Sequence, residues 1–326
     1  MINVVYASDD NFAEIMGISI LSLLENNKKA EEICIHILED SISDINKKRL
    51  LELTGIYNRK IIFYDVKKYL TDDMKQQRGS LSTFSRLFMT DILPADVTKA
   101  LYIDCDTLVV GSVEELYNTD LNGFYGAGVK DPISIHHFRN IGLSGKENYI
   151  NAGILLINLE KWRNENAPEK FMAFLDKYNG DVPYADQGII NGVMADKIKQ
   201  LDLKYNCYTM LYDFTYKKLQ SFRHPVEYYT QEQFNRAKRE PVIIHFTTSF
   251  ASLRPWIEGS RHPYAQQWLK YKSASPWKNE PFRKDNRSGK KKLMTKIYNV
   301  LPDFIAVRAV GILHSTIMPK LQGRNK

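Results

Sequence analysis

The chain has 326 residues, of which 44% are hydrophobic and 25% are charged, and its formal net charge at pH 7 is +7. This composition is typical of a globular protein and excludes a chain that is disordered over most of its length. The three cysteines, Cys34, Cys105 and Cys207, are widely spaced and odd in number. We therefore predict neither a disulfide framework nor a zinc site, which favours a reducing, cytoplasmic setting.

The first 270 residues alternate strand-like and helix-like segments. Strands are predicted at residues 3–7, 33–38, 61–65, 100–103, 125–129, 154–158 and 242–245. Helices are predicted at residues 12–25, 43–53, 85–92, 168–178 and 185–195. Such alternation predicts one α/β domain with a mainly parallel sheet, which we place at residues 1–271.

The start of the sequence lacks the basic, apolar and small-residue regions of a signal peptide. The longest apolar stretch, residues 304–313, is shorter than a membrane span and contains Arg308. We therefore expect a cytoplasmic protein. Any contact that it makes with the inner face of the cell membrane should be peripheral.

Two carboxylates follow the predicted buried strand at residues 100–103. They belong to Asp104-Cys105-Asp106, and residues two positions apart in an extended chain face the same side. Neighbouring carboxylates repel each other, and a hard divalent cation with oxygen ligands relieves this repulsion. Ligands of α/β sheets also collect at the carboxyl ends of the strands. The pair therefore predicts a metal that carries a phosphate-bearing ligand, and the alternative is a solvated turn.

Residues 272–326 form a predicted C-terminal appendage with a different composition. They hold 13 Lys and Arg against three Asp and Glu, while residues 1–271 have a small acidic excess. Leu293, Ile297, Leu301 and Phe304 recur among these cations at helical spacing, which is typical of a helix at an anionic membrane surface. Aromatic residues that stack on bases are scarce, so we expect no nucleic-acid partner. A solvated linker and helix is the alternative.

Further motifs occur in a definite order along the chain. Asn151-Ala152-Gly153 leads into a predicted strand, Asp186-Gln187-Gly188 begins a helix, and His245 ends a strand before Arg254-Pro255-Trp256. In this combination, residues 1–256 resemble the family 8 glycosyltransferases, whose relatives include bacterial lipopolysaccharide galactosyl- and glucosyltransferases, glycogenin and galactinol synthase. The resemblance implies a GT-A fold, a single Rossmann-like nucleotide-binding domain. It also implies transfer of galactose or glucose, with retention of anomeric configuration, from a UDP-sugar to a hydroxyl of a cell-surface glycan, glycoprotein or glycolipid.

The resemblance also assigns roles to particular residues. Asp104, Asp106 and His245 would bind Mn²⁺, or Mg²⁺, because carboxylate and imidazole ligands suit Mn²⁺. Asp131 would face the acceptor, and Gln187 and Asp186 would lie at the transferred sugar. The donor-binding residues would be Ala7, Asp9, Asn11, Arg86, Asp104, Cys105, Asp106, Asn151 and Arg254.

Retention requires either a covalent intermediate or attack from the face that the leaving group vacates. The matching position holds Gln187, which is a poor nucleophile, with Asp186 beside it. We therefore favour attack on the same face. The last motif departs from many bacterial relatives, because its glycine is absent, its spacing is three residues longer and Arg254 replaces a lysine. An arginine there can still bind a phosphate.

Each assignment has a simpler alternative. His245 could be a structural histidine, Asp9 to Asn11 could cap the next helix, and Arg86 could lie on a helix surface. Asn151 could serve only a turn and Asp186 only a cap, while Trp162 and Trp256 are interpreted as packing residues. At the level of function, the alternatives are a phosphatase of the haloacid dehalogenase type and a non-catalytic module that binds a sugar nucleotide.

Overall fold

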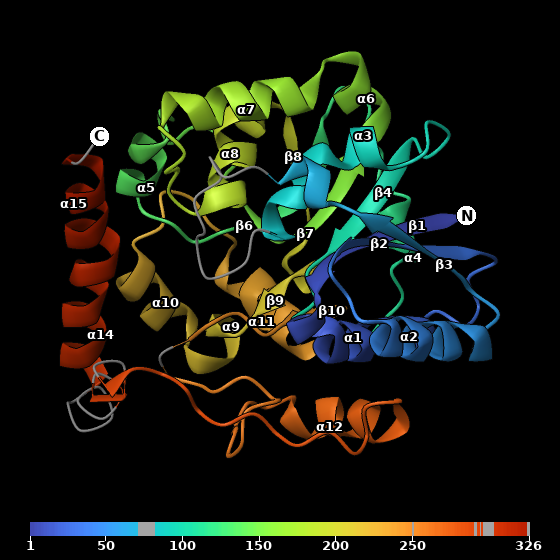
Figure 1. The fold of residues 1–326 in the computed structure, drawn as a ribbon. Coiled ribbons are helices and arrows are strands. Elements are labelled where there is room, and N and C mark those ends of the chain that lie inside the picture. Colours follow the sequence, from blue (N-terminus) through green and yellow to red (C-terminus); the bar gives the residue numbers. More distant parts are fainter. Residues whose placement is uncertain (71–81, 250, 290–291, 294, 296–302, 325–326) are drawn as a thin grey trace.

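The computed structural model describes residues 1–70, 82–249, 251–289, 292–293, 295 and 303–324. Its centre is a seven-stranded sheet in the order β3-β2-β1-β4-β7-β6-β8 (Figure 1). Neighbouring strands are parallel except where β7 meets β4 and β6. The strands are β1 Ile2–Asp9, β2 Ile33–Asp40, β3 Lys60–Asp65, β4 Lys99–Ile103, β6 Gly126–Lys130, β7 Ile150–Asn158 and β8 Ile198–Gln200.

Helices cover both faces of this sheet. In Figure 1, α1, α2 and α12 lie on one side, and α3, α6, α7 and α8 lie on the other. Alternate residues of β1 enter the two cores, Val4 and Tyr6 on the α1 side and Val5 and Ala7 on the opposite side, because successive strand side chains point to opposite faces. The helices are α1 Ala13–Asn26, α2 Asp44–Ile56, α3 Met89–Ile92, α4 Glu114–Tyr117, α5 Ile135–Asn140, α6 Leu159–Asn164, α7 Ala167–Lys177, α8 Ala185–Met194, α9 Met210–Asp213, α10 Tyr216–Arg223, α11 Gln231–Arg239, α12 Ala265–Ala274, α14 Asp303–Ile312 and α15 Met318–Arg324. Short turns of other helix types are η1 Asp10–Phe12, η2 Lys67–Tyr69, η3 Ser82–Phe88, η4 Ala195–Lys197, η5 Leu203–Tyr205 and η6 Leu313–Ile317.

The predicted α/β architecture is confirmed, with two local differences. The strand predicted at residues 242–245 lies outside the main sheet, as β10 (Ile243–His245) of a second sheet, β5-β10-β9. Its partners β5 (Thr107–Val109) and β9 (Cys207–Tyr208) were not predicted, because two or three residues are too few to show a period. The helix predicted at residues 85–92 is instead the 3₁₀ segment η3 followed by the short α3.

The second sheet joins distant parts of the chain. β10 pairs antiparallel with β5, so that His245 lies opposite Thr107, and parallel with β9. Two buried serines of α1 fasten β5 to the domain: Ser19 shares a hydrogen bond with the Thr107 hydroxyl at 2.7 Å, and Ser22 accepts one from the Val109 N–H at 2.9 Å. The end of β10 is thereby held beside the turn between β4 and β5.

Part of the predicted appendage packs closely on the α/β domain. The predicted boundary between residues 271 and 272 falls inside α12. Lys272 is buried and pairs with Glu14, and a Cβ atom on Gly17 of α1 would lie 2.3 Å from the Trp277 ring. Most residues of the helix predicted between Leu293 and Ile305 lie outside the described residues. The described helix of this region, α14, begins at Asp303.

Helices α14 and α15, with η6 between them, form an arm beside α10 and α5 (Figure 1). Gly311 allows close approach, because a Cβ atom there would lie 2.7 Å from the Ser221 carbonyl oxygen of α10. The Ser134 hydroxyl donates to the Ser315 carbonyl, and the Asn140 amide donates to the Pro319 carbonyl at 2.9 Å. Among the described residues, no helix is both long enough and apolar enough to cross a bilayer.

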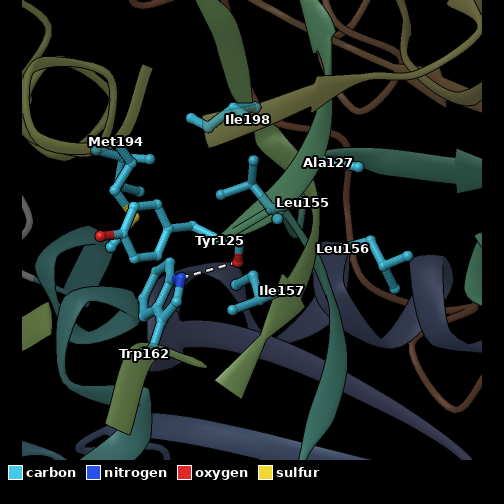
Figure 2. A pocket seen from close by; sticks show the side chains of 10 residues that line it. Tyr125, Ala127, Leu155, Leu156, Ile157, Trp162, Met194 and Ile198 are labelled. Carbon is cyan, nitrogen blue, oxygen red and sulfur yellow. Dashed lines mark hydrogen bonds between the residues drawn. The ribbon is translucent and has the colours of Figure 1, made fainter. Parts of the chain in front are cut away.

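The core beneath β6, β7 and β8 is well filled. Tyr125, Trp162, Met194 and Ile198 line a space of about 10 Å³, and Figure 2 shows how these side chains lie. The Trp162 indole donates to the Tyr125 carbonyl at 2.9 Å. A space of this size holds at most about one water molecule. It is therefore part of the core packing, and the interpretation of Trp162 as a packing residue is confirmed.

Candidate active site

Asp104, Asp106 and His245 meet where the two sheets adjoin. Asp104 follows β4, Asp106 precedes β5, and His245 ends β10. One possible ligand atom from each of the three lies within 4.8 Å of the others. His245 Nε2 is 3.1 Å from Asp106 Oδ1 and 3.7 Å from Asp104 Oδ2. The structure thus brings together the predicted metal ligands from positions far apart in the sequence.

The charges of this cluster stabilise one another. Burial alone would raise the pKa of Asp106, but His245 and Arg254 beside it lower that pKa below its ordinary value. Burial alone would likewise lower the pKa of His245, and Asp106 raises it instead. Two carboxylates and one imidazole within a few ångströms fit a divalent cation such as Mn²⁺, which accepts oxygen and nitrogen ligands together.

Gly153 at the start of the buried part of β7 makes the cluster possible. A Cβ atom at this position would lie 2.2 Å from His245 Cε1 and 2.9 Å from Asp104 Oδ2. The Asp104 N–H also donates to the Gly153 carbonyl at 2.8 Å. Only a residue without a side chain therefore fits between β7 and the two predicted ligands.

Arg86 connects the metal ligands to the opposite wall. It is 3% exposed, and its Nη2 donates to Asp104 Oδ1 at 2.8 Å, while its Nε lies 3.0 Å from Asp186 Oδ2. Burial alone would lower the pKa of Arg86, but Asp104 and Asp186 raise it above its ordinary value. The alternative that Arg86 lies on a helix surface is wrong.

A cavity of about 130 Å³ opens between these groups. Asn151, Asp186 and Gln187 face it from β7 and the start of α8. Tyr184 and Ala185, which lead into α8, both have positive φ, a strained conformation for residues with side chains. The lining residues are Thr83, Arg86, Asp104, Asp106, Asn151, Ala152, Gly153, Tyr184, Asp186, Gln187, His245, Thr247, Thr248 and Arg254.

Arg254 reaches the cavity from the lengthened loop after β10. Its Nη2 donates to Asp106 Oδ2 at 2.9 Å and to the Thr248 hydroxyl at 3.0 Å. Its Nε and the Thr247 hydroxyl are buried, and neither has a hydrogen-bond partner among the described residues. Trp256 is 3% exposed and packs in the core, as interpreted from the sequence. A buried N–H without a partner beside a cation site suits an anionic ligand.

Five predicted site residues do not line this cavity: Ala7, Asp9, Asn11, Cys105 and Asp131. Ala7 and Cys105 contact each other, because the Cys105 thiol donates to the Ala7 carbonyl at 3.1 Å. Asp9 accepts from the Phe12 N–H at 3.2 Å and caps η1, and Asn11 is exposed beside it. Ala7, Asp9 and Asn11 lie at or just after the carboxyl end of β1. Their contact with a nucleoside stays a prediction.

Asp131 lies behind the cavity wall at the end of β6. Its Oδ2 accepts from Gln187 Nε2 at 3.1 Å and from Asn151 Nδ2 at 3.3 Å, and its Oδ1 pairs with Arg223 of α10 at 3.2 Å. Asn206, just before β9, contacts His245 Nδ1 at 3.0 Å. Arg223 and Asn206 were not predicted, because no local spacing distinguishes a polar residue on a helix or in a turn when its partner is distant in sequence.

Together these features define a class of protein. An α/β domain with carboxylates at the end of a central strand, and arginines around the same cavity, is the arrangement of a GT-A glycosyltransferase. The sequence pattern of glycosyl transferase family 8 matches residues 3–259. The chain belongs to this family, and it is a hexosyltransferase of a family that retains anomeric configuration. This assignment replaces the phosphatase alternative.

Known proteins support the assignment. General stress protein A of Bacillus subtilis (strain 168) is 25% identical, with 85% of this chain and 95% of that protein covered. Lipopolysaccharide 1,2-glucosyltransferase of Escherichia coli is 29% identical, with 86% of this chain and 81% of that protein covered. The crystal structure of galactosyltransferase LgtC with donor and acceptor sugar analogues has a TM-score of 0.69 at 25% identity, and covers 84% of this chain and 96% of that one.

Proposed function

We propose that this chain transfers glucose or galactose from a UDP-sugar to a hydroxyl of a cell-surface glycan, glycoprotein or glycolipid. One observation carries the proposal. The three candidate metal ligands, Gln187, and Arg254, whose Nε has no partner among the described residues, all face one cavity. Family membership and the similarity to a lipopolysaccharide glucosyltransferase and to LgtC support a hexose donor and a glycan acceptor.

The proposed cofactor is Mn²⁺, with Mg²⁺ as the alternative, held by Asp104, Asp106 and His245. When bound, such a cation supplies a Lewis acid that stabilises the negative charge on a departing diphosphate. Arg254 lies beside the same carboxylates and offers its Nε to an anionic oxygen. Arg86 keeps Asp104 oriented through the 2.8 Å hydrogen bond from Nη2.

Retention is proposed to occur by attack on the face that the diphosphate leaves. Asp186 is 8% exposed and is engaged by Arg86 at 3.0 Å, which weakens it as a nucleophile. Gln187 Oε1 accepts from the Ala152 N–H at 3.2 Å and has a second lone pair with which to stabilise a cationic sugar carbon. A glycosyl adduct on Asp186, trapped and identified by mass spectrometry, would contradict same-face attack.

The experiment is a donor panel. The purified chain is incubated with Mn²⁺ and a set of UDP- and GDP-sugars, and release of the nucleoside diphosphate is measured. We expect slow hydrolysis of UDP-glucose or UDP-galactose that a chelator stops, with GDP-sugars unreactive. UDP-sugar binding without hydrolysis or transfer would instead support the non-catalytic module.

We also propose that the arm of α14 and α15 binds an anionic membrane surface at the inner face of the cell membrane. Its described part exposes apolar side chains between cationic ones, and such a face fits the boundary between lipid headgroups and acyl chains. The exposed apolar residues are Ile312, Leu313, Ile317, Met318 and Leu321. Vesicles of anionic and of neutral lipid test this proposal, and equal binding to the two by the full chain would contradict it.

A further inference from the structure

An ion pair behind the cavity contacts two of its amide side chains. Asp131 Oδ1 is paired with Arg223, whose side chain is 15% exposed and whose Nε also donates to the Pro132 carbonyl at 2.8 Å. Asp131 Oδ2 accepts from the amides of Asn151 and Gln187. A carboxylate can only accept hydrogen bonds, so both side chains must turn their NH₂ groups toward Asp131.

The opposite end of each amide is fixed independently. Gln187 Oε1 accepts from the Ala152 N–H at 3.2 Å, and Asn151 Oδ1 accepts from the Gly153 N–H at 3.0 Å. A backbone N–H can only donate. The two ends of each amide therefore agree on the same orientation, with the carbonyl oxygens turned toward β7 and away from Asp131.

The chain of hydrogen bonds continues from Asn151 to the candidate metal site. Asn206 Nδ2 donates to Asn151 Oδ1 at 2.9 Å, so the oxygen of Asn206 faces His245 Nδ1 at 3.0 Å. An amide oxygen can only accept, and His245 Nδ1 must therefore carry the proton. In the neutral ring this leaves the lone pair on Nε2, the atom beside Asp104 and Asp106.

We propose that Arg223 and Asn206 are positioning residues: the Arg223–Asp131 pair sets the direction of the hydrogen bonds through Asn151 and Asn206, which hold His245 in the tautomer whose Nε2 can bind a divalent cation. The same pair orients Gln187. In this proposal Asp131 acts through its hydrogen bonds to Asn151 and Gln187. The inference rests on the proposed function only for the use of the metal, since the hydrogen-bond directions through Asn151 and Asn206 do not depend on it.

The first test measures Mn²⁺ affinity in the presence of UDP, by titration with electron paramagnetic resonance of free Mn²⁺. Asn206→Ala removes the partner of His245 Nδ1, and we expect Mn²⁺ to bind about 10- to 100-fold more weakly, the usual loss for an outer partner of a metal-bound histidine. Asn148→Ala is the matched control. Asn148 donates to the Ile198 carbonyl from just before β7 but lies outside this chain of hydrogen bonds, and its removal should leave the affinity unchanged.

A second test observes the histidine itself. In wild-type protein labelled with ¹⁵N-histidine, with and without UDP and the diamagnetic Mg²⁺, we expect Nδ1 of His245 to carry a proton that it donates to Asn206 in both states. Nε2 should carry a proton toward Asp106 only when the cation is absent. Asp131→Asn places an amide that can also donate where only an acceptor stood, and should mix the two tautomers. Arg223→Lys keeps the positive charge and should retain the wild-type tautomer and most of the Mn²⁺ affinity, while Arg223→Met should not.

The inference is wrong if folded Asn206→Ala binds Mn²⁺ as tightly as the wild type, or if Nδ1 of wild-type His245 carries no proton. Should Asp131→Asn fail to fold, the measurements on Asn206→Ala and on the wild type still decide. A wild-type chain that binds no Mn²⁺ with UDP would contradict the proposed function instead, and the proton on Nδ1 of His245 would still test the inference.

Discussion

The cavity and the C-terminal arm both break the usual division between a polar surface and an apolar interior, in opposite directions. At the cavity, Arg86 and His245 are buried and Asp106 is half-buried, and these charged side chains pair with opposite charges. On the arm, apolar side chains such as Ile317 and Leu321 are exposed. Buried charges and exposed apolar patches are the departures that mark function. The cavity depends on exact partners, whereas the arm depends only on surface composition.

Removal of the carboxylate charges should give the largest effect. Asp104→Asn and Asp106→Asn each replace a carboxylate proposed to bind the metal by a neutral amide, and Asp106→Asn also leaves Arg254 without the carboxylate with which it pairs. We expect UDP-hexose hydrolysis to fall below about one hundredth of the wild-type rate, because loss of an outer partner alone costs about 10- to 100-fold. Initial rates with and without a chelator measure this. Full activity of the double variant would require another active site.

A single added methyl group should disturb the cavity next most strongly. Gly153→Ala places a Cβ atom within 2.2 Å of His245 and 2.9 Å of Asp104. We expect the free energy of unfolding to fall by about 1–3 kcal/mol, the usual cost of overpacking, together with weaker Mn²⁺ binding. Urea denaturation and Mn²⁺ titration measure these effects.

The matched control is Gly55→Ala in α2, where nothing lies within 4 Å of the new atom. In a helix this change should stabilise the protein by up to about 1 kcal/mol. Equal stability changes for the two variants would show that the close approach of β7 to His245 is not required.

Acid should lower the free energy of unfolding through buried neutral histidines, which lie outside the cavity with its paired charges. Burial lowers the pKa of His36 and of His262 from 6.5 to about 4. The unfolded chain therefore binds more protons than the folded one below pH 6.5, and the free energy of unfolding should decrease as the pH falls from 6.5 toward 4. Urea denaturation across this range measures the slope. His36→Gln should flatten it, and an unchanged slope would contradict the assignment.

The elements of the main sheet could be predicted because their residues carry the pattern themselves. β1, β2 and β4 consist mainly of apolar residues and are buried along nearly their whole length, as expected for strands covered on both faces. Asp104 and Asp106 were recognisable for the same reason, since they follow directly after such a run. The resemblance to a family then supplied His245, Asn151 and Gln187, which no single motif would have identified.

Other parts of the site depend on contacts between residues distant in sequence. β5, β9 and β10 are two or three residues long and form a sheet only with one another. Asn206 and Arg223 belong to no motif, and their partners, Asn151 and Asp131, lie 55 and 92 residues away in the sequence. In the sequence, Arg86 is a basic residue within a predicted helix. In the structure it lies in the 3₁₀ segment η3, and its guanidinium is buried between Asp104 and Asp186.

Substitutions on the arm should have the smallest effect on stability and hydrolysis, which would separate the role of the arm from that of the cavity. In Ile317→Ser with Leu321→Ser, the replaced side chains are 45% and 55% exposed, and the free energy of unfolding should change by no more than about 0.5 kcal/mol, with UDP-hexose hydrolysis unaltered. Binding to anionic vesicles should weaken at least about tenfold, because each CH₂ group in lipid contributes about 0.8 kcal/mol. Ile45→Ser, at a 68% exposed isoleucine of α2, is the control and should leave vesicle binding unchanged. If the control weakens binding as much as the arm variant does, the exposed apolar face of the arm has no special role at the membrane.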